Sequence, residues 1–311
     1  MGQRFGLLGT GHWARETQGA ALAAHPEAEL VGVWGRDPAK AANLAAHLGT
    51  RPYEDVDALI ADVDAVAIAL PPDVQGDLAL RAARAGRHLL LDKPVALDLD
   101  VADALVAEAG VRGLASVVFF THRFSDNVDT FLRTAADEGG WDGARATLFA
   151  SIFRSDNPYG ASPWRREKGG LWDVGPHLLS LVLPVLGPVE EVTALNGPRD
   201  SVHVLTRHRD GAVGSFSVTL DAAPEATTFS IDLYGEPGTR AVPGGDRGAA
   251  VAFGSAIDRL LDQVAGTPGD PCDLRFGREV VAVLTAAEES VRSGRTTRVT
   301  EAAGSDPAAS R

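Results

Sequence analysis

A glycine-containing loop near the start of the chain has the spacing of a phosphate-binding turn. It follows the apolar residues 5–8 and reads Gly9-Thr10-Gly11-His12-Trp13-Ala14. The glycines permit a tight turn and let backbone N–H groups approach a pyrophosphate at the start of a helix. The loop therefore predicts a dinucleotide site with Thr10, His12 and Trp13 beside the phosphates. His12 and Trp13 would suit the exposed surface of a first helical turn equally well.

The residues at the end of the second apolar run indicate whether NAD or NADP binds. NAD-specific sites usually place Asp or Glu about 20 residues after the loop, where the carboxylate accepts from the ribose 2′-hydroxyl. Here the chain reads Trp34-Gly35-Arg36. A guanidinium suits a 2′-phosphate, so we expect NADP in preference to NAD. Asp37 is the alternative ribose ligand, although before Pro38 it is more simply a helix cap. Arg36 could also be a solvated loop cation.

Three side chains have the chemistry to hold or move a proton. Lys93 follows the expected strand at residues 88–91. Open α/β sheets bind ligands at the carboxyl ends of their strands, where an ammonium could stabilise an alkoxide. An imidazole, with an ordinary pKa of about 6.5, suits a general acid or base, which makes His177 a candidate. On one helix Asp173 would share a face with His177 and could orient a substrate. The structural alternatives are a surface cation for Lys93 and a helix cap for Asp173.

The elements that must position these side chains change in type along the chain. Short apolar runs alternate with Ala-rich helical stretches at first, a pattern typical of parallel strands joined by right-handed crossovers. The expected strands are residues 5–8, 30–34, 65–70, 88–91 and 117–120. A helix over 125–138 is then followed by period-two strands and two last helices. These later elements are expected at 144–153, 189–195, 202–208, 215–220, 229–234, 251–265 and 276–293.

The predicted fold class is α/β, with two domains and a short tail. Residues 1–121 are expected to form an NAD(P)-binding Rossmann domain, a doubly wound parallel sheet. Residues 122–301 are expected to form an α+β domain for substrate binding and oligomerisation, built on a mostly antiparallel open sheet. Such a division allows a cleft between the domains. Residues 302–311 are small and polar, so we expect a disordered tail.

Composition narrows the class of protein and its partners. The net charge of −13, with no basic block, argues against nucleic acid and anionic membranes as partners. A single cysteine, Cys272, excludes an internal disulfide and fits a reducing compartment. Without a leader pattern at the N-terminus, and without an apolar run near the roughly 20 residues of a membrane span, we expect a cytoplasmic protein. The scattered histidines predict no metal site.

Two separated motifs occur in the two predicted domains. The first reads Ala85-Gly86-Arg87-His88-Leu89-Leu90-Leu91-Asp92-Lys93-Pro94. The second is Trp164-Arg165 followed by Gly169-Gly170-Leu171-Trp172-Asp173-Val174-Gly175-Pro176-His177. Together they resemble the glucose–fructose oxidoreductase and inositol 2-dehydrogenase family, the Gfo/Idh/MocA group, which has AGKHV and EKP in the first motif and GG…DxGxH in the second. The chain departs from the family pattern at Asp92 for Glu, at Gln75 for a frequent His, and at Ser180 for a frequent acidic residue.

The resemblance implies an activity and a set of site residues. The activity is hydride transfer between a nicotinamide and a carbinol or carbonyl carbon of a sugar, cyclitol or similar polyol, in a homodimer or homotetramer. The catalytic positions fall on Lys93, Asp173 and His177. The cofactor contacts fall on Leu70, Pro71, Asp92 and Lys93 in addition to the glycine loop and Arg36. Trp164, Arg165 and Arg123 are expected near the substrate, with an interdomain salt bridge as the alternative for Arg123.

Two other functions are compatible with the same fold. A sensor or regulator could bind NAD(P) without turnover, although Lys93 and His177 favour an enzyme. An NAD-dependent glycosidase, as some relatives of the family are, would hydrolyse a sugar without net NADH. Binding and turnover measurements with a panel of sugars separate these functions.

Overall fold

The computed structural model describes residues 2–154 and 157–302 and divides into two compact units. Unit 1 comprises Met1–Thr130 and Pro243–Gly277, and unit 2 comprises Phe131–Val242 and Arg278–Arg311. Residues 243–277 thus cluster with the first unit, although the sequence pattern assigned them to the second domain. The predicted domain boundary at residue 121 stays a prediction, because a compact unit need not fold alone. The predicted disordered tail lies outside the described residues except for Ala302.

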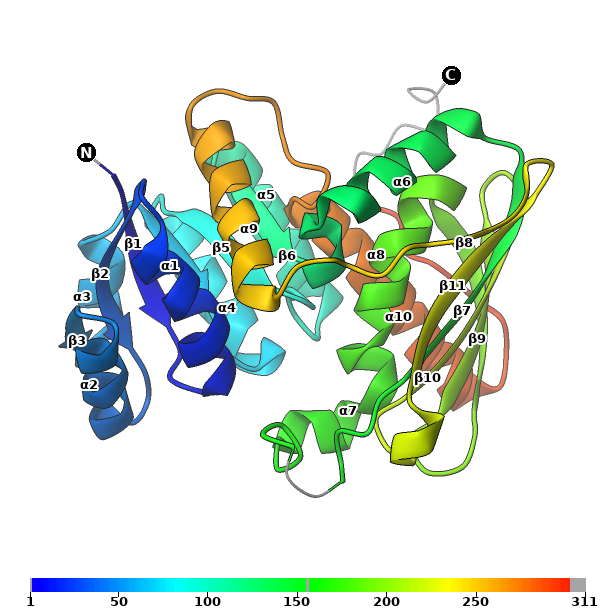
Figure 1. Ribbon diagram of the computed structural model, residues 1–311, viewed down its shortest axis with the longest axis horizontal. Coiled ribbons are helices and arrows are strands. Elements are labelled where there is room, and N and C mark those ends of the chain that lie inside the picture. The colour runs from blue at the N-terminus through cyan, green and yellow to red at the C-terminus, as the bar shows by residue number, and fades with distance from the viewer. Residues whose placement is uncertain (1, 155–156, 303–311) are drawn as a thin grey trace. The chain divides into compact units, whose positions relative to one another are not determined.

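Unit 1 is built on a parallel sheet of six strands in the order β3-β2-β1-β4-β5-β6 (Figure 1, blue to cyan-green). The strands are β1 (Gln3–Leu8), β2 (Ala28–Trp34), β3 (Arg51–Tyr53), β4 (Ala65–Ile68), β5 (His88–Asp92) and β6 (Ser116–Phe119). Every residue of β4 and β6 is buried, as expected for a parallel sheet covered on both faces. This order confirms the predicted Rossmann sheet.

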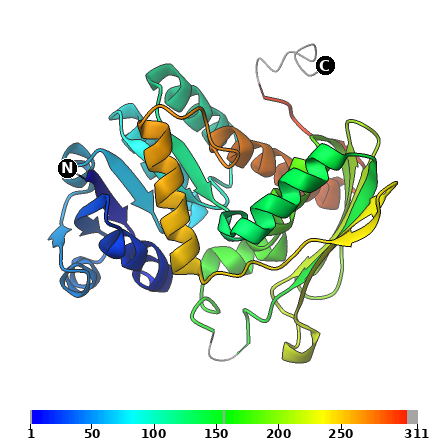
Figure 2. The same cartoon turned by 45° about the horizontal axis from the view of Figure 1, so that its top comes forward.

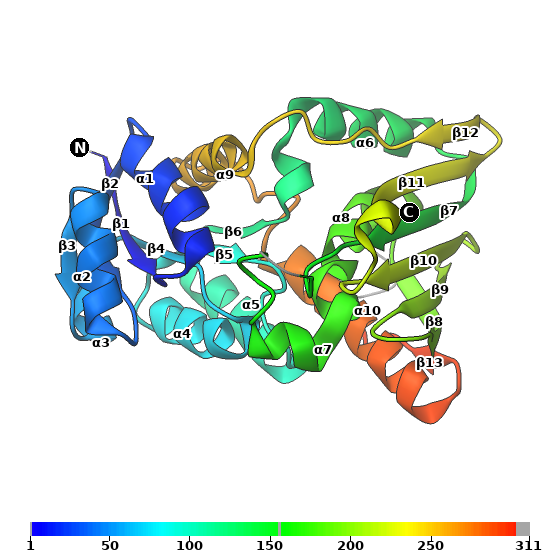
Figure 3. The ribbon, with the colours of Figure 1, turned by 60° about the horizontal axis from the view of Figure 1, so that its bottom comes forward.

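Helices cover both faces of this sheet. They are η1 (Ala14–Gly19), α1 (Ala20–Ala24), α2 (Pro38–His47), α3 (Val56–Ala61), α4 (Pro72–Arg84), α5 (Leu99–Arg112) and α9 (Ala249–Val264), with the short η2 (Thr121–Phe124) after β6. The late helix α9 packs beside α1 on one face, as Figure 2 shows in orange and blue, and it contacts β5 and β6. Helices α4 and α5 pack against each other on the opposite face (Figure 3).

Unit 2 contains a mixed sheet of seven strands in the order β12-β11-β7-β10-β9-β8-β13. The strands are β7 (Trp141–Phe149), β8 (Val189–Asn196), β9 (Val202–His208), β10 (Val213–Thr219), β11 (Thr228–Gly235), β12 (Gly238–Ala241) and β13 (Thr297–Arg298). Within this second sheet, β7 and β10 are the only neighbouring described strands that pair in parallel. Burial alternates along β9, which agrees with the predicted period of two and a sheet with one solvated face.

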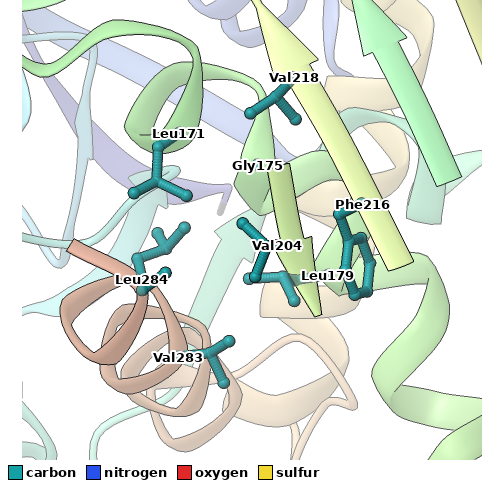
Figure 4. A pocket seen from close by; sticks show the side chains of 9 residues that line it. Leu171, Gly175, Leu179, Val204, Phe216, Val218, Val283 and Leu284 are labelled. Atoms are coloured by element: carbon teal, nitrogen blue, oxygen red, sulfur yellow. The ribbon is translucent and has the colours of Figure 1, made fainter. Parts of the chain in front are cut away.

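Helices pack on one face of the second sheet. They include α7 (Pro163–Asp173), α8 (Gly175–Leu186) and α10 (Leu274–Ser293), and α6 (Asp126–Glu138) leads from unit 1 into β7. Figure 3 shows α8 and α10 on the same side of the strands. Apolar side chains of α8, α10, β9 and β10 surround a small cavity of about 20 Å³, drawn in Figure 4. The other face carries Leu195 and Leu205, which are 66% and 53% exposed.

One stretch, Pro163–Leu186, is long and apolar enough to cross a membrane by length and composition. This corrects the expectation that no run approaches that length. The most apolar part of the stretch is 78% buried inside the structure, as for a core helix of a globular protein. It is also not one regular helix, because Gly169 has φ 62° and ψ −161°.

Candidate cofactor and active site

The loop after β1 has a backbone that only glycine fits. Gly9 has a φ of 130°, and a Cβ on it would lie 2.4 Å from the carbonyl oxygen of Ala69. A Cβ on Gly11 would meet nothing within 4 Å, so this glycine borders open space. The backbone is helical from His12 to Ala24, and the first turn of a helix directs N–H groups out of its N-terminal end. The loop therefore fits the pyrophosphate of a dinucleotide.

The two bulky residues of the loop are placed differently. His12 is exposed, whereas Trp13 is half-buried. The Trp13 ring lies 6.3 Å from the ring of Phe119, centroid to centroid, at the end of β6. Trp13 therefore packs toward the sheet, and a phosphate contact through its side chain stays a prediction. The exposed His12 lies on the first helical turn.

A pocket with cationic walls adjoins the glycine loop. It has a volume of about 320 Å³ and is lined by Thr10, Arg15, Ala39, Lys40, Asn43 and Leu44. Asp37 accepts hydrogen bonds from the backbone N–H groups of Ala39 (3.0 Å) and Lys40 (3.1 Å). This carboxylate therefore caps α2, which is the simpler of its two expected roles. The neighbouring Arg36 side chain is exposed.

The predicted contacts from the middle of the chain follow neighbouring strands. Leu70 and Pro71 come after β4, and Asp92 and Lys93 lie at the end of β5. Because β1, β4 and β5 are adjacent and parallel, these residues and the glycine loop share the carboxyl edge of one sheet. Lys93 is half-buried. Its backbone N–H donates to the Asp92 side chain at 2.8 Å.

Asp173 is paired with an arginine inside unit 2. Its carboxylate, 5% exposed, accepts a hydrogen bond from Nε of Arg165 at 2.8 Å. The Arg165 guanidinium also lies over the rings of Trp164 (4.6 Å) and Tyr159 (4.8 Å). Trp164 is itself 8% exposed, so it supports the guanidinium and exposes little of its ring. The acidic and basic side chains thus form one rigid group.

The expected single helix bearing Asp173 and His177 is not regular. Asp173 ends α7, Val174 has φ −107° and ψ −19°, and His177 lies in α8. The His177 N–H donates to the carbonyl of Val174 at 3.1 Å, so the chain makes a tight turn between the two residues. The four-residue spacing therefore does not put them one above the other on a continuous α-helix. His177 is half-buried.

The paired glycines before Asp173 are fixed by a distant carboxylate. Asp200, in the loop after β8, accepts hydrogen bonds from the N–H groups of Gly170 (3.2 Å), Leu220 (2.8 Å) and Asp221 (3.2 Å). It also accepts from the Thr219 hydroxyl. The carboxylate thereby joins the start of the Gly170 turn to the end of β10. It holds the backbone that leads into Asp173.

Arg123 lies in a buried charged cluster of unit 1. It is 4% exposed, its guanidinium lies 5.7 Å from the centre of the Phe276 ring, and its carbonyl accepts from Arg259 at 3.1 Å. These contacts favour a structural role, and its predicted substrate contact remains untested. Burial raises the pKa of the nearby Cys272 thiol to about 11, which makes it an inert thiol at neutral pH. No group of three potential metal ligands occurs within residues 2–154 and 157–302.

Sequence reasoning overlooked several residues that surround these groups. Arg15 and Lys40 line the pocket beside the glycine loop, and Asp200 fixes the second motif. Gln75 departs from the family pattern, yet its side chain bonds the backbone around Lys93. The position of Arg15, four residues after Gly11, was the one signal available, because that spacing puts a cation on the first turns of the helix.

Two family models match the chain. An oxidoreductase family with an NAD-binding Rossmann fold matches residues 3–120, and the GFO/IDH/MocA C-terminal domain matches residues 143–240. UDP-N-acetylglucosamine 3-dehydrogenase of Acidithiobacillus ferrooxidans is 38% identical over 93% of this chain and 97% of its own length. The dTDP-3,4-didehydro-2,6-dideoxy-alpha-D-glucose 3-reductase of Streptomyces antibioticus is 34% identical over 60% of this chain, and the match spans only 57% of that protein.

Solved structures share the whole fold. The WlbA dehydrogenase from Bordetella pertussis, solved with NADH and UDP-GlcNAcA, has a TM-score of 0.84 and 24% identity over 96% of this chain and 98% of its own. The solved structure of the A. ferrooxidans 3-dehydrogenase has a TM-score of 0.78, and the structural match has 25% identity over 94% of this chain and 99% of its own. Both family models and a relative that matches nearly end to end lead to one conclusion: the chain belongs to the Gfo/Idh/MocA family and is an NAD(P)-dependent oxidoreductase.

Proposed function

We propose that the protein transfers a hydride between a nicotinamide and a carbinol or carbonyl carbon of a sugar, cyclitol or similar polyol. The observation that carries this proposal is the placement of Lys93 on the same sheet edge as the glycine loop, at the ends of the adjacent β1, β4 and β5. Relatives whose names give sugar-linked activities, such as the UDP-N-acetylglucosamine 3-dehydrogenase, support the substrate class.

Each catalytic side chain has a proposed role. When bound, the nicotinamide supplies or accepts the hydride. Lys93 holds the substrate oxygen with its ammonium, and His177 takes or returns the hydroxyl proton. Asp173 positions the substrate, and Arg165 orients that carboxylate through the contact at 2.8 Å. Trp164 and Arg123 are proposed to support the substrate site.

Replacement of Lys93 tests these roles. Lys93→Met should lower turnover by about 10²- to 10³-fold, the usual loss when a donor that stabilises a developing oxyanion is removed. The assay follows cofactor absorbance with free hexoses, cyclitols and nucleotide-linked hexoses. An unchanged cofactor Kd in the variant shows that the loss is catalytic. Turnover within a few-fold of wild type would show that the assignment of Lys93 is wrong.

We further propose that NADP is preferred over NAD. Asp37, the carboxylate next to Arg36 in the chain, is occupied as the cap of α2. Arg36 follows β2, and Arg15 and Lys40 line the adjoining pocket; these three cations are proposed to bind the 2′-phosphate. Contacts to the pyrophosphate are proposed from Gly9–Gly11 and His12.

Cofactor titration tests the preference. Intrinsic fluorescence should report tighter binding of NADPH than of NADH to wild type. Arg36→Ala should weaken NADPH at least tenfold and leave NADH within twofold, because only NADPH carries the extra phosphate. Arg84→Ala, an exposed arginine at the end of α4, is the matched control. Tighter binding of NADH would reverse the proposed preference, and binding without turnover on any sugar would favour a sensor.

The assembly and location are proposed from surface and composition. The exposed Leu195 and Leu205 on one face of the second sheet support a homodimer or homotetramer through that face. Light scattering of wild type and Leu205→Glu should show a smaller mass for the variant. A cytoplasmic location agrees with the single, buried Cys272.

A further inference from the structure

We propose that Gln75 is a positioning residue that fixes the backbone segment carrying Lys93. The inference rests on the proposed catalytic role of Lys93. Gln75 lies in the first turn of α4, 17 residues before Asp92, and its own side chain is not expected to touch the substrate. It acts through the segment formed by residues 92–95, at and after the end of β5.

Both ends of the Gln75 amide bond to that segment. The side-chain nitrogen, Nε2, donates to the carbonyl oxygens of Asp92 (2.8 Å), Pro94 (3.0 Å) and Val95 (3.3 Å). The side-chain oxygen, Oε1, accepts the N–H of Asp92 at 2.9 Å. Lys93 therefore lies between residues whose backbone groups are held on either side. Gln75 is 1% exposed, so water does not compete for these bonds.

The packing around these hydrogen bonds of the Gln75 side chain, here called the clamp, is tight. A Cβ on the neighbouring Gly76 would lie 2.8 Å from Val101 Cγ1 and 3.3 Å from Ala96 Cβ, which shows how closely α4 approaches the end of the segment. Val95 and Ala96 are 0% and 2% exposed. The Gln75 N–H donates to the Pro71 carbonyl at 2.8 Å. The clamp consequently joins the segment after β5 to the turn after β4, where a cofactor contact is also proposed.

An amide of this length both donates and accepts, as the site requires. A glutamate has the same shape but would turn a carboxylate oxygen toward three carbonyl oxygens, and a leucine would leave an N–H and three carbonyls without this partner. Either change should let the segment move. A displacement of about 1 Å at a catalytic group can cost about 100-fold in rate.

The test combines enzyme kinetics with amide hydrogen exchange on the full chain. Gln75→Leu should lower kcat about 10- to 100-fold, change KM and the NADPH Kd less than threefold, and raise exchange at Asp92 and its neighbours at least tenfold. In a Lys93→Met background the same change should lower kcat less than twofold, because Gln75 acts through Lys93. A general loss of stability would lower kcat in both backgrounds.

Gln263→Leu is the matched control. Gln263 also bonds a backbone N–H and carbonyl, those of Ser116, at 3.3 and 3.2 Å, but at the opposite end of the sheet, where β6 starts. It should raise exchange only near Ser116 and leave kcat unchanged. If Gln75→Leu does not fold, Gln75→Glu, which has the native shape, is measured in its place.

Three results would overturn the inference: unchanged exchange at Asp92, unchanged kcat, or an equal loss of kcat with and without Lys93. If wild type turns over no sugar, or if Lys93→Met is fully active, the proposed function fails instead. The exchange data of the unliganded protein still decide whether the clamp exists.

Discussion

Replacing Gly169 by alanine should destabilise the protein through backbone conformation alone. Gly169 has φ 62° and ψ −161°, a region that residues other than glycine essentially do not occupy and that costs about 1–3 kcal/mol. The added Cβ would lie 3.6 Å from Asp200 Cβ, an ordinary contact. Alanine also lowers the conformational entropy of the unfolded chain, which offsets about 0.4–1 kcal/mol of the lost stability. The expected net loss is roughly 1–2 kcal/mol.

Gly170→Ala should destabilise the protein for a different reason, a steric clash. A Cβ on Gly170 would lie 2.8 Å from the Thr219 Cα, so the turn must move away from β10. That movement stretches the 3.2 Å hydrogen bond from the Gly170 N–H to Asp200. We expect a loss at the upper end of the roughly 1–3 kcal/mol typical of overpacking, together with lower turnover because Asp173 follows on the same turn.

Calorimetry measures both effects. At about 2–4 °C per kcal/mol, Gly169→Ala should lower Tm by roughly 2–8 °C, and Gly170→Ala by more. Gly254→Ala is the control, since its Cβ would meet nothing within 4 Å in α9; it should raise stability by about 0.5–1 kcal/mol. If Gly169→Ala is as stable as wild type, the backbone argument is refuted.

Three further predictions concern unit 2. Val283→Ile should fill part of the 20 Å³ cavity and stabilise by up to about 0.8 kcal/mol in urea unfolding, whereas a loss would show the cavity is too small. Burial lowers the pKa of His208, so the neutral imidazole stabilises the folded protein above a pH of about 6.5, and this stability is lost as the pH falls toward the lowered pKa. His208→Gln should therefore reduce the fall in Tm between pH 7 and 5. The same change at the exposed His203 should not. Arg165→Ala and Asp173→Ala should be non-additive by about 0.5–3 kcal/mol in a double-mutant cycle, reflecting their 2.8 Å bond; additive losses would contradict a coupled pair.

Periodic patterns of apolar residues predicted the strands and helices well where the pattern covers many residues. The run at 202–208 matches β9 at both ends, and the glycine loop is followed by a helix as expected. Two-residue strands such as β13 (Thr297–Arg298) are too short for periodicity to reveal. Asp173 and His177 lie on two successive helices, α7 and α8, because the backbone at Val174 is not regular; that their side chains share one face stays a prediction.

The supports of the site were harder to predict than the site itself. Gln75 bonds residues 17 to 20 positions away, and Asp200 bonds Gly170 across 30 positions. Such bonds join a side chain to backbone groups. Because nearly every residue has the same backbone groups, the sequence does not indicate which of them a side chain will bond. The sequence therefore indicates which side chains have suitable chemistry, whereas the groups that hold them depend on tertiary structure.

The return of residues 243–277 to unit 1 has a consequence for synthesis on the ribosome. Helix α9 contributes Phe253, Ile257 and Leu260, each 0% exposed, and Phe253 packs edge-on against Phe119 at 4.9 Å. A nascent chain that has emerged only to the end of β6 lacks α9, so the face of its parallel sheet that α1 and α9 cover together is only partly covered. The nucleotide-binding half must therefore wait for more than a hundred later residues before its core closes, and a fragment ending near residue 121 is expected to aggregate.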